Sequence, residues 1–574
     1  MKSFSIALVL FLFCFNIHAQ SPSWLWSTSF GGTANDLAVS IVIDSAGDVY
    51  TVGTFAGTVD FDPGTAVFNK TAAGSQDIYI SKLDASGNFL WANTIGGINW
   101  DEALSVVLDP QGNIYITGDF SDIVDFDPGS GTFNLNAATS NDIFICKMDA
   151  AGNFIWAKAM GGMGDDGGTA IALDGMGNIY TTGYFSASAD MDPGTSIFNV
   201  TSTGTYGVFI TKLDNAGNFI WSKAFGGLSG VGTNAMAIEQ STGDVYITGS
   251  FLGTVDFDPA ATSTIYTSAG NEDLYICKFD SSGNLLWAKA TGGPINEGGY
   301  SIALDAAGNV YTTGYFSFAT IDFDPGAGVF NMTANGADVF ITKYNSAGAF
   351  NWAKQFAGLS SNFGIGYGLI VDPINGDIYT TGSFDGEVDF DPGVVNFTLI
   401  SNNSSDVFVS KLDSAGNFAW AKAAGGTWDD EGHTLAISPT GYIYVAGYYP
   451  SPTIMFGSNT LVNANNTGLI NDIFIAKLNN VVTGIVNVKG SENISIYPNP
   501  TSGNFTLSMR TNSTVPNIEI IDITGKPIPF SSEISQVGEL KTVKIKLIKG
   551  EEGIYIFKIS TPAFTEIKRV VVID

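Results

Sequence analysis

Cysteine and histidine are scarce in this chain of 574 residues, which has three cysteines and two histidines. Cys14 lies in an N-terminal apolar run, whereas Cys146 and Cys277 occupy the same position of two non-adjacent repeats, where we expect small buried side chains. A disulfide between them is not expected on geometry. His433 is the only histidine beyond the N-terminal run. The shortage excludes histidine-rich zinc sites and a catalytic triad chosen among several histidines.

Positive charge is the second shortage. The net charge is −31, and only 14% of residues are charged. From Ser491 onward nine basic and nine acidic residues balance, so the region before Ser491 carries the whole acidic excess, and that region contains no arginine. Binding to nucleic-acid phosphates requires a basic surface. We therefore expect no nucleic-acid partner and no attraction to anionic lipid.

Long apolar runs are missing beyond the first residues, so no transmembrane helix is expected. Lys2 precedes an apolar run, Ile6–Phe15, that is too short to span a bilayer. Ala19 then places a small residue before a cleavage point at Gln20. This pattern predicts a secretory signal peptide over residues 1–19 and therefore an exported protein.

One long motif is repeated along most of the chain. Each copy contains W-[AS]-x-x-x-[GA]-G, and successive copies are 65 to 68 residues apart. The marker tryptophans are Trp26, Trp91, Trp156, Trp221, Trp287, Trp352 and Trp420. A fixed period of this length indicates repeated supersecondary units.

Each repeat has the pattern of four β-strands rich in Val, Ile, Phe and Tyr and bounded by Gly and Asp. In one repeat the expected strands are Ala103–Asp109, Asn113–Phe120, Asp142–Met148 and Asn153–Met160. Asp at the first and Gly at the fourth position of the short connections predict type I turns. Four antiparallel strands repeated about seven times predict a seven-bladed β-propeller. Because the last repeat has no Trp strand, the N-terminal strand Trp24–Phe30 is expected to complete its blade and close the ring.

The repeats resemble a known family. The segments DxxGNxYxTG, D[IV]F[IV]xKLD and GNFxWAKxxGG, between Trp24 and Leu478, are similar to the seven-bladed β-propeller (SBBP) repeats of bacterial exported proteins. The resemblance implies a propeller over residues 20–480. It implies little about activity, because such families are named for their fold.

The C-terminal part has a different pattern. Strand-like segments at Ser491–Met509, Ile518–Lys526, Gly553–Ser560 and Ile567–Asp574 predict a small antiparallel β-sandwich after a linker at 481–492. The segments YPNPTSG, DITGK and GIYIFKI resemble the C-terminal sorting domain of type IX secretion substrates of Bacteroidetes-type bacteria. The resemblance implies that residues 493–574 are recognised by the type IX machinery, and that the protein crosses the outer membrane and is then secreted or attached to the cell surface.

The long connection between the second and third strands of six repeats carries a pair of aspartates in the motif [VA]-D-[FM]-D-P-[GA]. Carboxylates two residues apart on an extended strand share a side, and Ca²⁺ prefers such oxygen ligands. The alternative is that Asp-Pro-Gly forms a tight turn whose carboxylates accept backbone hydrogen bonds. The pairs are Asp60 and Asp62, Asp125 and Asp127, Asp190 and Asp192, Asp256 and Asp258, Asp322 and Asp324, and Asp389 and Asp391.

A second set of acids stands just before the first strand of five repeats. It consists of Asp36, Asp101, Asp166, Glu297 and Asp430. Because the first strand is expected to line the central channel, these acids predict a negative ring at the channel mouth that could bind a cation or polar ligand. The alternative is that each carboxylate caps its own Gly-Gly loop.

Two tryptophans outside the repeat position lie in equivalent loops on the face that carries the long connections. Trp100 precedes Asp101, and Trp428 precedes Asp429, Asp430 and Glu431. An exposed aromatic ring beside carboxylates suits sugar recognition. The alternative is that each tryptophan covers a junction between blades.

The sequence therefore predicts an exported binding or adhesion module that contacts polysaccharide or a surface protein through this face. The sequence indicates no catalytic residues, and Ca²⁺ is the only cofactor that its motifs suggest. One alternative is a polysaccharide-degrading enzyme that uses carboxylates such as Asp429, Asp430 and Glu431. Another is a structural component of the surface layer.

Overall fold

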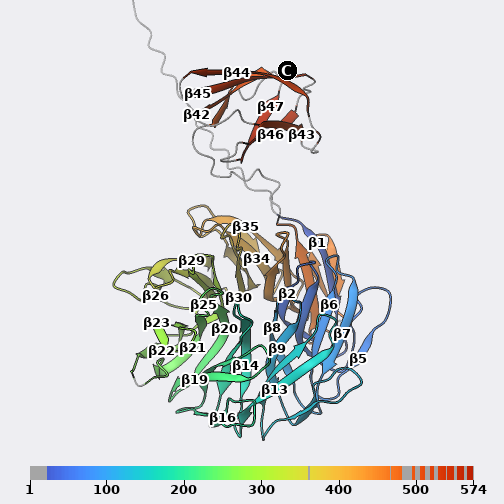
Figure 1. Ribbon diagram of the computed structural model, residues 1–574, viewed down its shortest axis with the longest axis vertical. Coiled ribbons are helices and arrows are strands. Elements are labelled where there is room, and N and C mark those ends of the chain that lie inside the picture. Colours follow the sequence, from blue (N-terminus) through green and yellow to red (C-terminus); the bar gives the residue numbers. More distant parts are fainter. Residues whose placement is uncertain are drawn as a thin grey trace, which may run out of the picture. The chain divides into compact units, whose positions relative to one another are not determined.

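The computed structural model describes residues 22–480, except 261, 360, 361 and 466, together with the strands beyond residue 493 and residues 526, 528, 529 and 548. The predicted signal peptide, 1–19, and the predicted linker, 481–492, lie outside the described residues. The chain divides into two compact units, one spanning Ser21–Val481 and the other including Val482–Asp574. Every helix or strand in the described residues is a β-strand, so the predicted all-β class is confirmed (Figure 1).

The repeated element of the first unit is a four-stranded antiparallel meander. In one copy, β8 (Glu102–Leu108), β9 (Ile114–Phe120), β12 (Asp142–Met148) and β13 (Phe154–Gly162) pair in that order. These bounds agree with the four strands expected from alternating apolar residues. The short connection predicted as a type I turn has its hydrogen bond, since Gly112 N donates to Asp109 O at 2.9 Å.

The same order of pairing recurs in the other copies. They are β2 (Leu37–Ile43), β3 (Val49–Phe55), β6 (Asp77–Leu83) and β7 (Phe89–Ile95); β14 (Gly167–Leu173), β15 (Ile179–Phe185), β18 (Gly207–Leu213) and β19 (Phe219–Gly227); β20 (Val231–Ile238), β21 (Val245–Asp256), β22 (Ile265–Phe279) and β23 (Leu285–Thr291); β24 (Glu297–Leu304), β25 (Val310–Ser317), β28 (Ala337–Tyr344) and β29 (Phe350–Gly358); and β30 (Gly364–Val371), β31 (Ile378–Phe384), β34 (Asp406–Leu412) and β35 (Phe418–Ala424).

The last meander joins both ends of the unit. Its strands β36 (Glu431–Ile437), β37 (Ile443–Tyr449) and β40 (Asp472–Leu478) are followed in the sheet by β1 (Trp24–Phe30). β1 pairs antiparallel with β40, with Ser27 opposite Ala476. The N-terminal strand therefore occupies the position that the repeat pattern predicts for it.

The first strands of the meanders contact one another in a closed cycle. The contacts run from β2 to β8, β14, β20, β24, β30 and β36, and from β36 back to β2. Figure 1 shows the meanders of this unit fanning outward from these strands. This is a β-propeller-like arrangement. One end of its axis is framed by the starts of the first strands and by the long connections, and we call this end the decorated face.

Short hairpins occupy the long connections on the decorated face. Six of them enclose the Asp-x-Asp motif or its remnant between two short strands, and in the fourth meander the extended β21 and β22 take their place. The separate hairpins pair β4 (Thr58–Asp60) with β5 (Asn69–Thr71), β10 (Ile123–Asp125) with β11 (Asn134–Asn136), β16 (Ser188–Asp190) with β17 (Asn199–Thr201), β26 (Thr320–Asp322) with β27 (Asn331–Thr333), β32 (Glu387–Asp389) with β33 (Thr398–Ile400), and β38 (Thr453–Phe456) with β39 (Asn459–Val462).

The marker tryptophans join neighbouring meanders. Trp221 on β19 donates from Nε1 to the carbonyl of Ser281 in the next meander at 3.2 Å. The adjacent turn glycine, Gly283, has φ +78, and a Cβ there would lie 2.9 Å from the Trp221 ring. The motif thus needs glycine both for a left-handed turn residue and for space under the indole ring.

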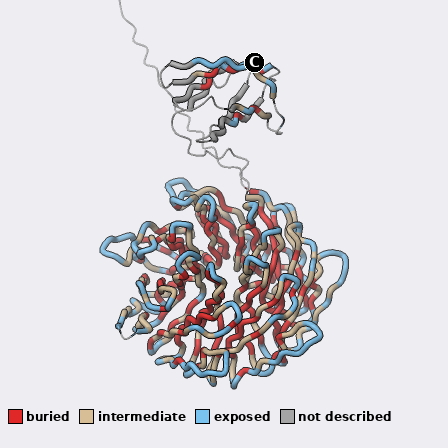
Figure 2. The backbone as a smooth tube through the Cα atoms, viewed as in Figure 1, coloured by how far each residue is buried: buried red, intermediate tan, exposed pale blue. Residues whose placement is uncertain are grey.

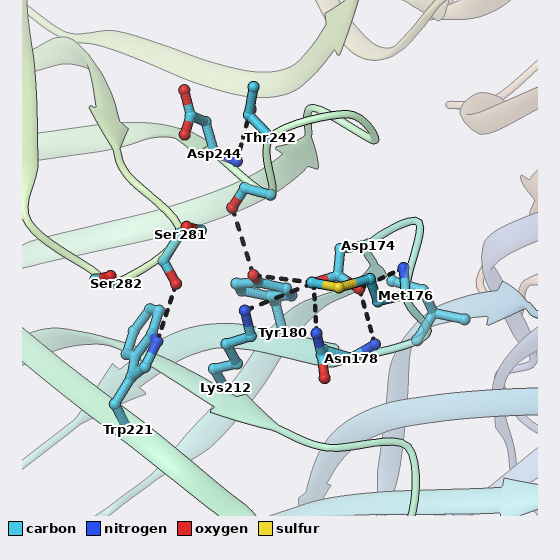
Figure 3. A network of polar contacts seen from close by, with 12 residues as sticks. Asp174, Met176, Asn178, Tyr180, Lys212, Trp221, Thr242, Asp244, Ser281 and Ser282 are labelled. Carbon is cyan, nitrogen blue, oxygen red and sulfur yellow. Dashed lines mark hydrogen bonds and ion pairs between the residues drawn. The ribbon is translucent and has the colours of Figure 1, made fainter.

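A buried polar network fixes the opposite end of the third meander (Figure 3). Lys212 Nζ lies 3.6 Å from Asp174 Oδ2 and 4.7 Å from the centre of the Tyr180 ring. The Tyr180 hydroxyl donates to Asp174 at 3.2 Å, and Asp174 Oδ1 accepts hydrogen bonds from the turn amides of Met176 and Asn178. Much of the acidic charge therefore holds turns, as the turn pattern predicts. Burial follows the strands, with exposure concentrated in the connections (Figure 2).

The second unit contains two antiparallel sheets. One has the order β41 (Ile494–Tyr497), β42 (Asn504–Arg510), β45 (Leu540–Leu547), β44 (Phe530–Val537). The other has the order β43 (Asn517–Asp522), β46 (Gly553–Ser560), β47 (Thr565–Val572). Buried residues of both sheets, among them Leu507, Val543, Ile520 and Phe557, form one apolar cluster.

Candidate binding site

The Asp-x-Asp pairs are engaged by their own backbone. Asp60 Oδ1 accepts hydrogen bonds from Asp62 N at 3.1 Å and Phe68 N at 2.8 Å, and Asp62 Oδ1 accepts from Gly64 N at 2.8 Å. The equivalent bonds recur at Asp125 and Asp127, Asp190 and Asp192, Asp256 and Asp258, Asp322 and Asp324, and Asp389 and Asp391. Within the described residues no three His, Cys, Asp or Glu side chains gather as a metal site requires. The geometry therefore favours the tight-turn interpretation over Ca²⁺ binding.

The acids that precede the first strands are buried rather than exposed at a channel mouth. Asp36, Asp101, Asp166, Glu297 and Asp430 each have at most 1% of their surface exposed. Asp101 accepts hydrogen bonds from Gly97 N at 2.7 Å and Ser121 N at 3.0 Å, and Asp430 accepts from Gly426 N at 2.6 Å and Ser451 Oγ at 3.0 Å. These carboxyls close the Gly-Gly loops, so they do not form an exposed negative ring. The capping alternative fits their geometry.

Burial changes the acidity of these capping groups. It raises the pKa of Asp36 and Asp430 to about 8, that of Glu297 to about 7, and that of Asp101 and Asp166 to about 6. Backbone hydrogen bonds oppose the shift but do not cancel it. Their perturbed pKa values therefore reflect a structural role.

The two candidate tryptophans are both about half exposed, but their rings contact different parts of the protein. Trp100, 48% exposed, donates from its indole N–H to the carboxylate of Glu102 on β8. Trp428, 46% exposed, lies against Gly468 in the connection between β39 and β40. Only Trp100 is therefore linked to a side chain of a first strand, whereas Trp428 covers a neighbouring loop.

The three acids that follow Trp428 lie in different environments. Asp429 accepts hydrogen bonds from Ser404 Oγ and Ser405 N. Asp430 is buried, as described, and Glu431 accepts a hydrogen bond from Tyr448 OH at 2.9 Å. A glycosidase needs two carboxyl groups facing one substrate. The structure does not bring these three together in that way.

The repeats differ most in residue type at one pair of positions, where the first and second strands of a meander lie opposite each other near the decorated end. We call this set of opposed residues the axial tier. Its pairs are Leu37 and Thr54, Glu102 and Asp119, Gly167 and Tyr184, Gly232 and Ser250, Gly298 and Tyr315, Ile365 and Ser383, and Glu431 and Tyr448. Because the remaining strand positions are nearly repeated, this variation gives the axis an asymmetric lining.

Aromatic side chains pack next to one side of the axial tier. Tyr367 stacks on His433 with ring centres 4.5 Å apart, and His433 packs against Tyr448 at 4.8 Å. Tyr300 packs edge-on against Tyr367 at 5.4 Å. His433 Nε2 lies 3.0 Å from Glu431 Oε2. Although burial acts in the opposite direction, hydrogen bonding and the charge of His433 lower the pKa of Glu431.

The other side of the axial tier is acidic. Glu102 and Asp119 face each other across β8 and β9, and Asn141 Nδ2 donates to Asp119 at 2.8 Å. Burial, followed by the charges of Glu102 and Asp165, raises the pKa of Asp119 well above its usual range. Burial also raises the pKa of Glu102. This side of the axis therefore holds more carboxyl groups than positive charges to balance them.

A cavity of about 540 Å³, which we call the axial cavity, opens between the third and fourth meanders at the decorated end. Its lining includes Asp165, Tyr184, Tyr206, Asn234, Ser250 and Glu272. The rings of Tyr184 and Tyr206 meet edge to face, with centres 5.5 Å apart. The size and the mixture of aromatic and polar groups are typical of a small-molecule site.

The cavity exists because the fourth repeat departs from the pattern. Val231 replaces the capping aspartate, and nothing lies within 4 Å of a Cβ built on Gly230 or Gly232. Gly230 also has φ +113. Sequence reasoning missed this cavity, although the lost aspartate at Val231 was a visible signal.

Comparison with known proteins identifies the C-terminal part. Residues 495–573 match the secretion system C-terminal sorting domain. This domain marks proteins that are exported across the outer membrane and are secreted or held at the cell surface. The protein is therefore an exported substrate of the type IX secretion machinery, as predicted. Within the part of the chain that the structure describes, no helix has the length and apolar character of a membrane span.

Two relatives match parts of this chain. A WD repeat-containing protein of Acanthamoeba polyphaga mimivirus, itself uncharacterised, is 23% identical over 563 residues, which cover 83% of this chain and 40% of the relative. The regulatory protein FlaEY of Caulobacter vibrioides is 23% identical over 230 residues, which cover 39% of this chain and 22% of that protein. The chain thus spans less than half the length of either relative. The WD-repeat likeness agrees with a propeller-like fold.

A solved structure was also found. A protein of Bacteroides thetaiotaomicron that carries the name phosphatase aligns over 79% of this chain and 97% of its own, with 12% identity and a TM-score of 0.23. An overlap this poor carries no argument about fold or function.

Proposed function

We propose that the first unit is a seven-bladed β-propeller, with β1 completing the last blade, and that the second unit is a small β-sandwich. The recurring meanders, the closed cycle of first strands and the pairing of β1 with β40 support the first assignment. The shared apolar cluster of the two C-terminal sheets supports the second. The proposed boundaries are a signal peptide at 1–19, the propeller at 20–480, a linker at 481–492 and the sorting domain at 493–574.

The propeller is proposed to be a carbohydrate-binding module that works outside the cell. The observation that carries this proposal is the axial cavity on the decorated face. Tyr184 and Tyr206 offer aromatic surface for a sugar ring, and Asn234, Ser250 and Glu272 offer hydrogen-bonding groups for hydroxyls. Because sorting places the protein outside the cell, extracellular polysaccharide is the ligand class that it would meet.

Two other functions remain as rivals. A polysaccharide-degrading enzyme would need a facing pair of carboxyl groups, and the opposed Glu102 and Asp119 are the nearest such pair in the axial tier. A structural surface component would need neither the cavity nor its aromatic wall.

The proposal is tested by incubating the full chain with insoluble chitin, chitosan, cellulose and xylan and measuring both retained protein and released sugar ends. Tyr206→Ala removes one wall of the cavity, and Trp428→Ala is the control because it removes an exposed aromatic ring of the same face outside the cavity. We expect retention without release, and its loss only in Tyr206→Ala.

Each other outcome contradicts part of the proposal. Loss of retention only in Trp428→Ala would show that the binding site lies at the loop that carries Trp428 and not in the cavity. Release of sugar ends would make the protein an enzyme. No retention on any polysaccharide would favour the structural role.

A further inference from the structure

The axial cavity carries negative charge that no positively charged side chain balances. None of the residues that line it is basic. Asp165 and Glu272 have no ion-pair partner among the described residues, whereas Lys212 and other repeat lysines pair with turn carboxylates at the far end of the meanders. A ligand that enters the cavity therefore meets negative charge and no protein cation.

Both cavity carboxylates keep oxygen atoms available. Asp165 accepts only long hydrogen bonds, from Ser140 Oγ and Tyr206 OH, each at 3.3 Å. Glu272 is exposed and accepts a hydrogen bond from Ser250 Oγ at 3.0 Å through one oxygen. Each carboxylate can thus accept a further, charge-assisted hydrogen bond from a ligand.

The aromatic wall favours the same kind of ligand. Tyr184 and Tyr206 stand edge to face beside Asp165, and the face of a tyrosine ring attracts a cation. A positively charged group in the cavity would be held by carboxylates and ring faces together.

We propose that the axial cavity binds a sugar that carries a free, protonated amino group, as in glucosamine polymers. The ammonium would be held between Asp165 and Glu272, and the sugar ring would rest against Tyr206. This inference rests on the proposed carbohydrate-binding function and narrows its ligand class. An acetylated amine at the same carbon has no charge and would lose these contacts.

The test is calorimetric titration of the full chain, at about pH 6 where the sugar amine is protonated, with the β-1,4 tetramers of glucosamine and of N-acetylglucosamine. The two ligands differ in charge and in the acetyl group. We expect the amino form to bind at least about tenfold more tightly, which corresponds to about 1.4 kcal/mol. The preference should vanish in Asp165→Asn/Glu272→Gln.

The control variant is Glu387→Gln, which removes one negative charge from an exposed position on β32 outside the cavity. It should keep the preference, so that the general acidity of the protein is excluded as the cause. Equal binding of both tetramers, or loss of preference in Glu387→Gln, would overturn the inference.

The inference and the proposed function fail in different ways. Binding of neither tetramer by a protein that is still retained on another insoluble polysaccharide would overturn the ammonium site alone. Binding of neither tetramer and no retention at all would overturn both.

Discussion

At the scale of single residues, the acids of this protein divide by position into buried structural groups and groups that line the axial cavity. The capping acids Asp36 and Asp430 are completely buried and accept hydrogen bonds from loop amides. Asp165 and Glu272 instead line the axial cavity. A net charge of −31 therefore says little about binding until each carboxyl group is placed.

The buried caps predict an unusual dependence of stability on pH. Their folded-state pKa values are raised above the unfolded value, so the folded protein holds more protons between about pH 4 and pH 8. Stability from this source is complete below about pH 4 and is lost as the pH rises toward 8. We expect the melting temperature to fall by a few degrees or more between about pH 5 and pH 8.

Thermal melting of the full chain across this range checks the prediction. Asp430→Asn removes one titrating cap and should make the fall shallower. A melting temperature that rises from pH 5 to pH 8 would show that the caps are ionised throughout and that their hydrogen bonds outweigh burial.

The position of the capping acids was predictable from the sequence, but their exposure was not. Asp101 and Asp430 stand at the same position of their repeats, yet only the fold shows that loop amides such as Gly97 N and Gly426 N donate hydrogen bonds to them. The cavity could not be predicted from the sequence, because its lining comes from separated segments that no single motif connects. These segments include Asp165, Tyr206 and Glu272.

At the scale of elements, every marker tryptophan except Trp420 joins its meander to the next by placing its indole ring over a turn glycine. The pair Trp221 and Gly283 shows the arrangement, and the same packing occurs between Trp26 and Gly87 across the two ends of the unit. The period of the sequence motif is therefore the period of this contact. This explains why strands and turns were predictable from the repeat alone.

The contribution of this contact can be measured by two glycine substitutions. Gly283 and Gly441 have φ +78 and +83, but a new Cβ would meet the Trp221 ring only at Gly283, whereas nothing lies within 4 Å at Gly441. Gly441→Ala should cost about 1–2 kcal/mol from the left-handed backbone alone. Gly283→Ala should cost about 1–3 kcal/mol more from overpacking.

Urea unfolding midpoints of the two variants provide the comparison. The excess loss in Gly283→Ala measures crowding of the new Cβ against the Trp221 ring and the neighbouring Lys223 side chain. Equal losses would mean that the indole ring adapts and that the contact does not hold neighbouring meanders together.

At the scale of the whole molecule, the two ends of the first unit meet in one sheet through β1 and β40. Lys477 Nζ and Trp26 Nε1 both donate to the carbonyl of Ala85, which joins this sheet to the first meander. Trp420 Nε1 is buried without a partner among the described residues. Its side chain packs in the apolar cluster of the last meander, whose strand β40 pairs with the N-terminal strand β1.

A cross-link at this junction should stabilise the protein more than the same cross-link inside a meander. Ser27 lies opposite Ala476 on β1 and β40, and Ser81 lies opposite Ala92 at the matching position of β6 and β7. A disulfide at the first pair closes a loop of roughly 450 residues, and one at the second closes roughly 10, a difference of about 3 kcal/mol in chain entropy.

The variants Ser27→Cys/Ala476→Cys and Ser81→Cys/Ala92→Cys are compared by thermal melting in oxidised and reduced form. We expect a clearly larger increase on oxidation for the first. An equal or smaller increase would argue that opening between β1 and β40 does not limit the stability of the ring.

The central claim is that the axial cavity of the decorated face is the binding site, and filling it tests that claim most directly. Gly232→Phe places a ring in the open space beside Ser250, and Ile365→Phe enlarges the matching axial-tier position on a meander that does not line the cavity. On whichever polysaccharide retains the full chain, we expect Gly232→Phe to lose retention at an unchanged melting temperature and Ile365→Phe to keep it. Full retention of a folded Gly232→Phe protein would contradict the account.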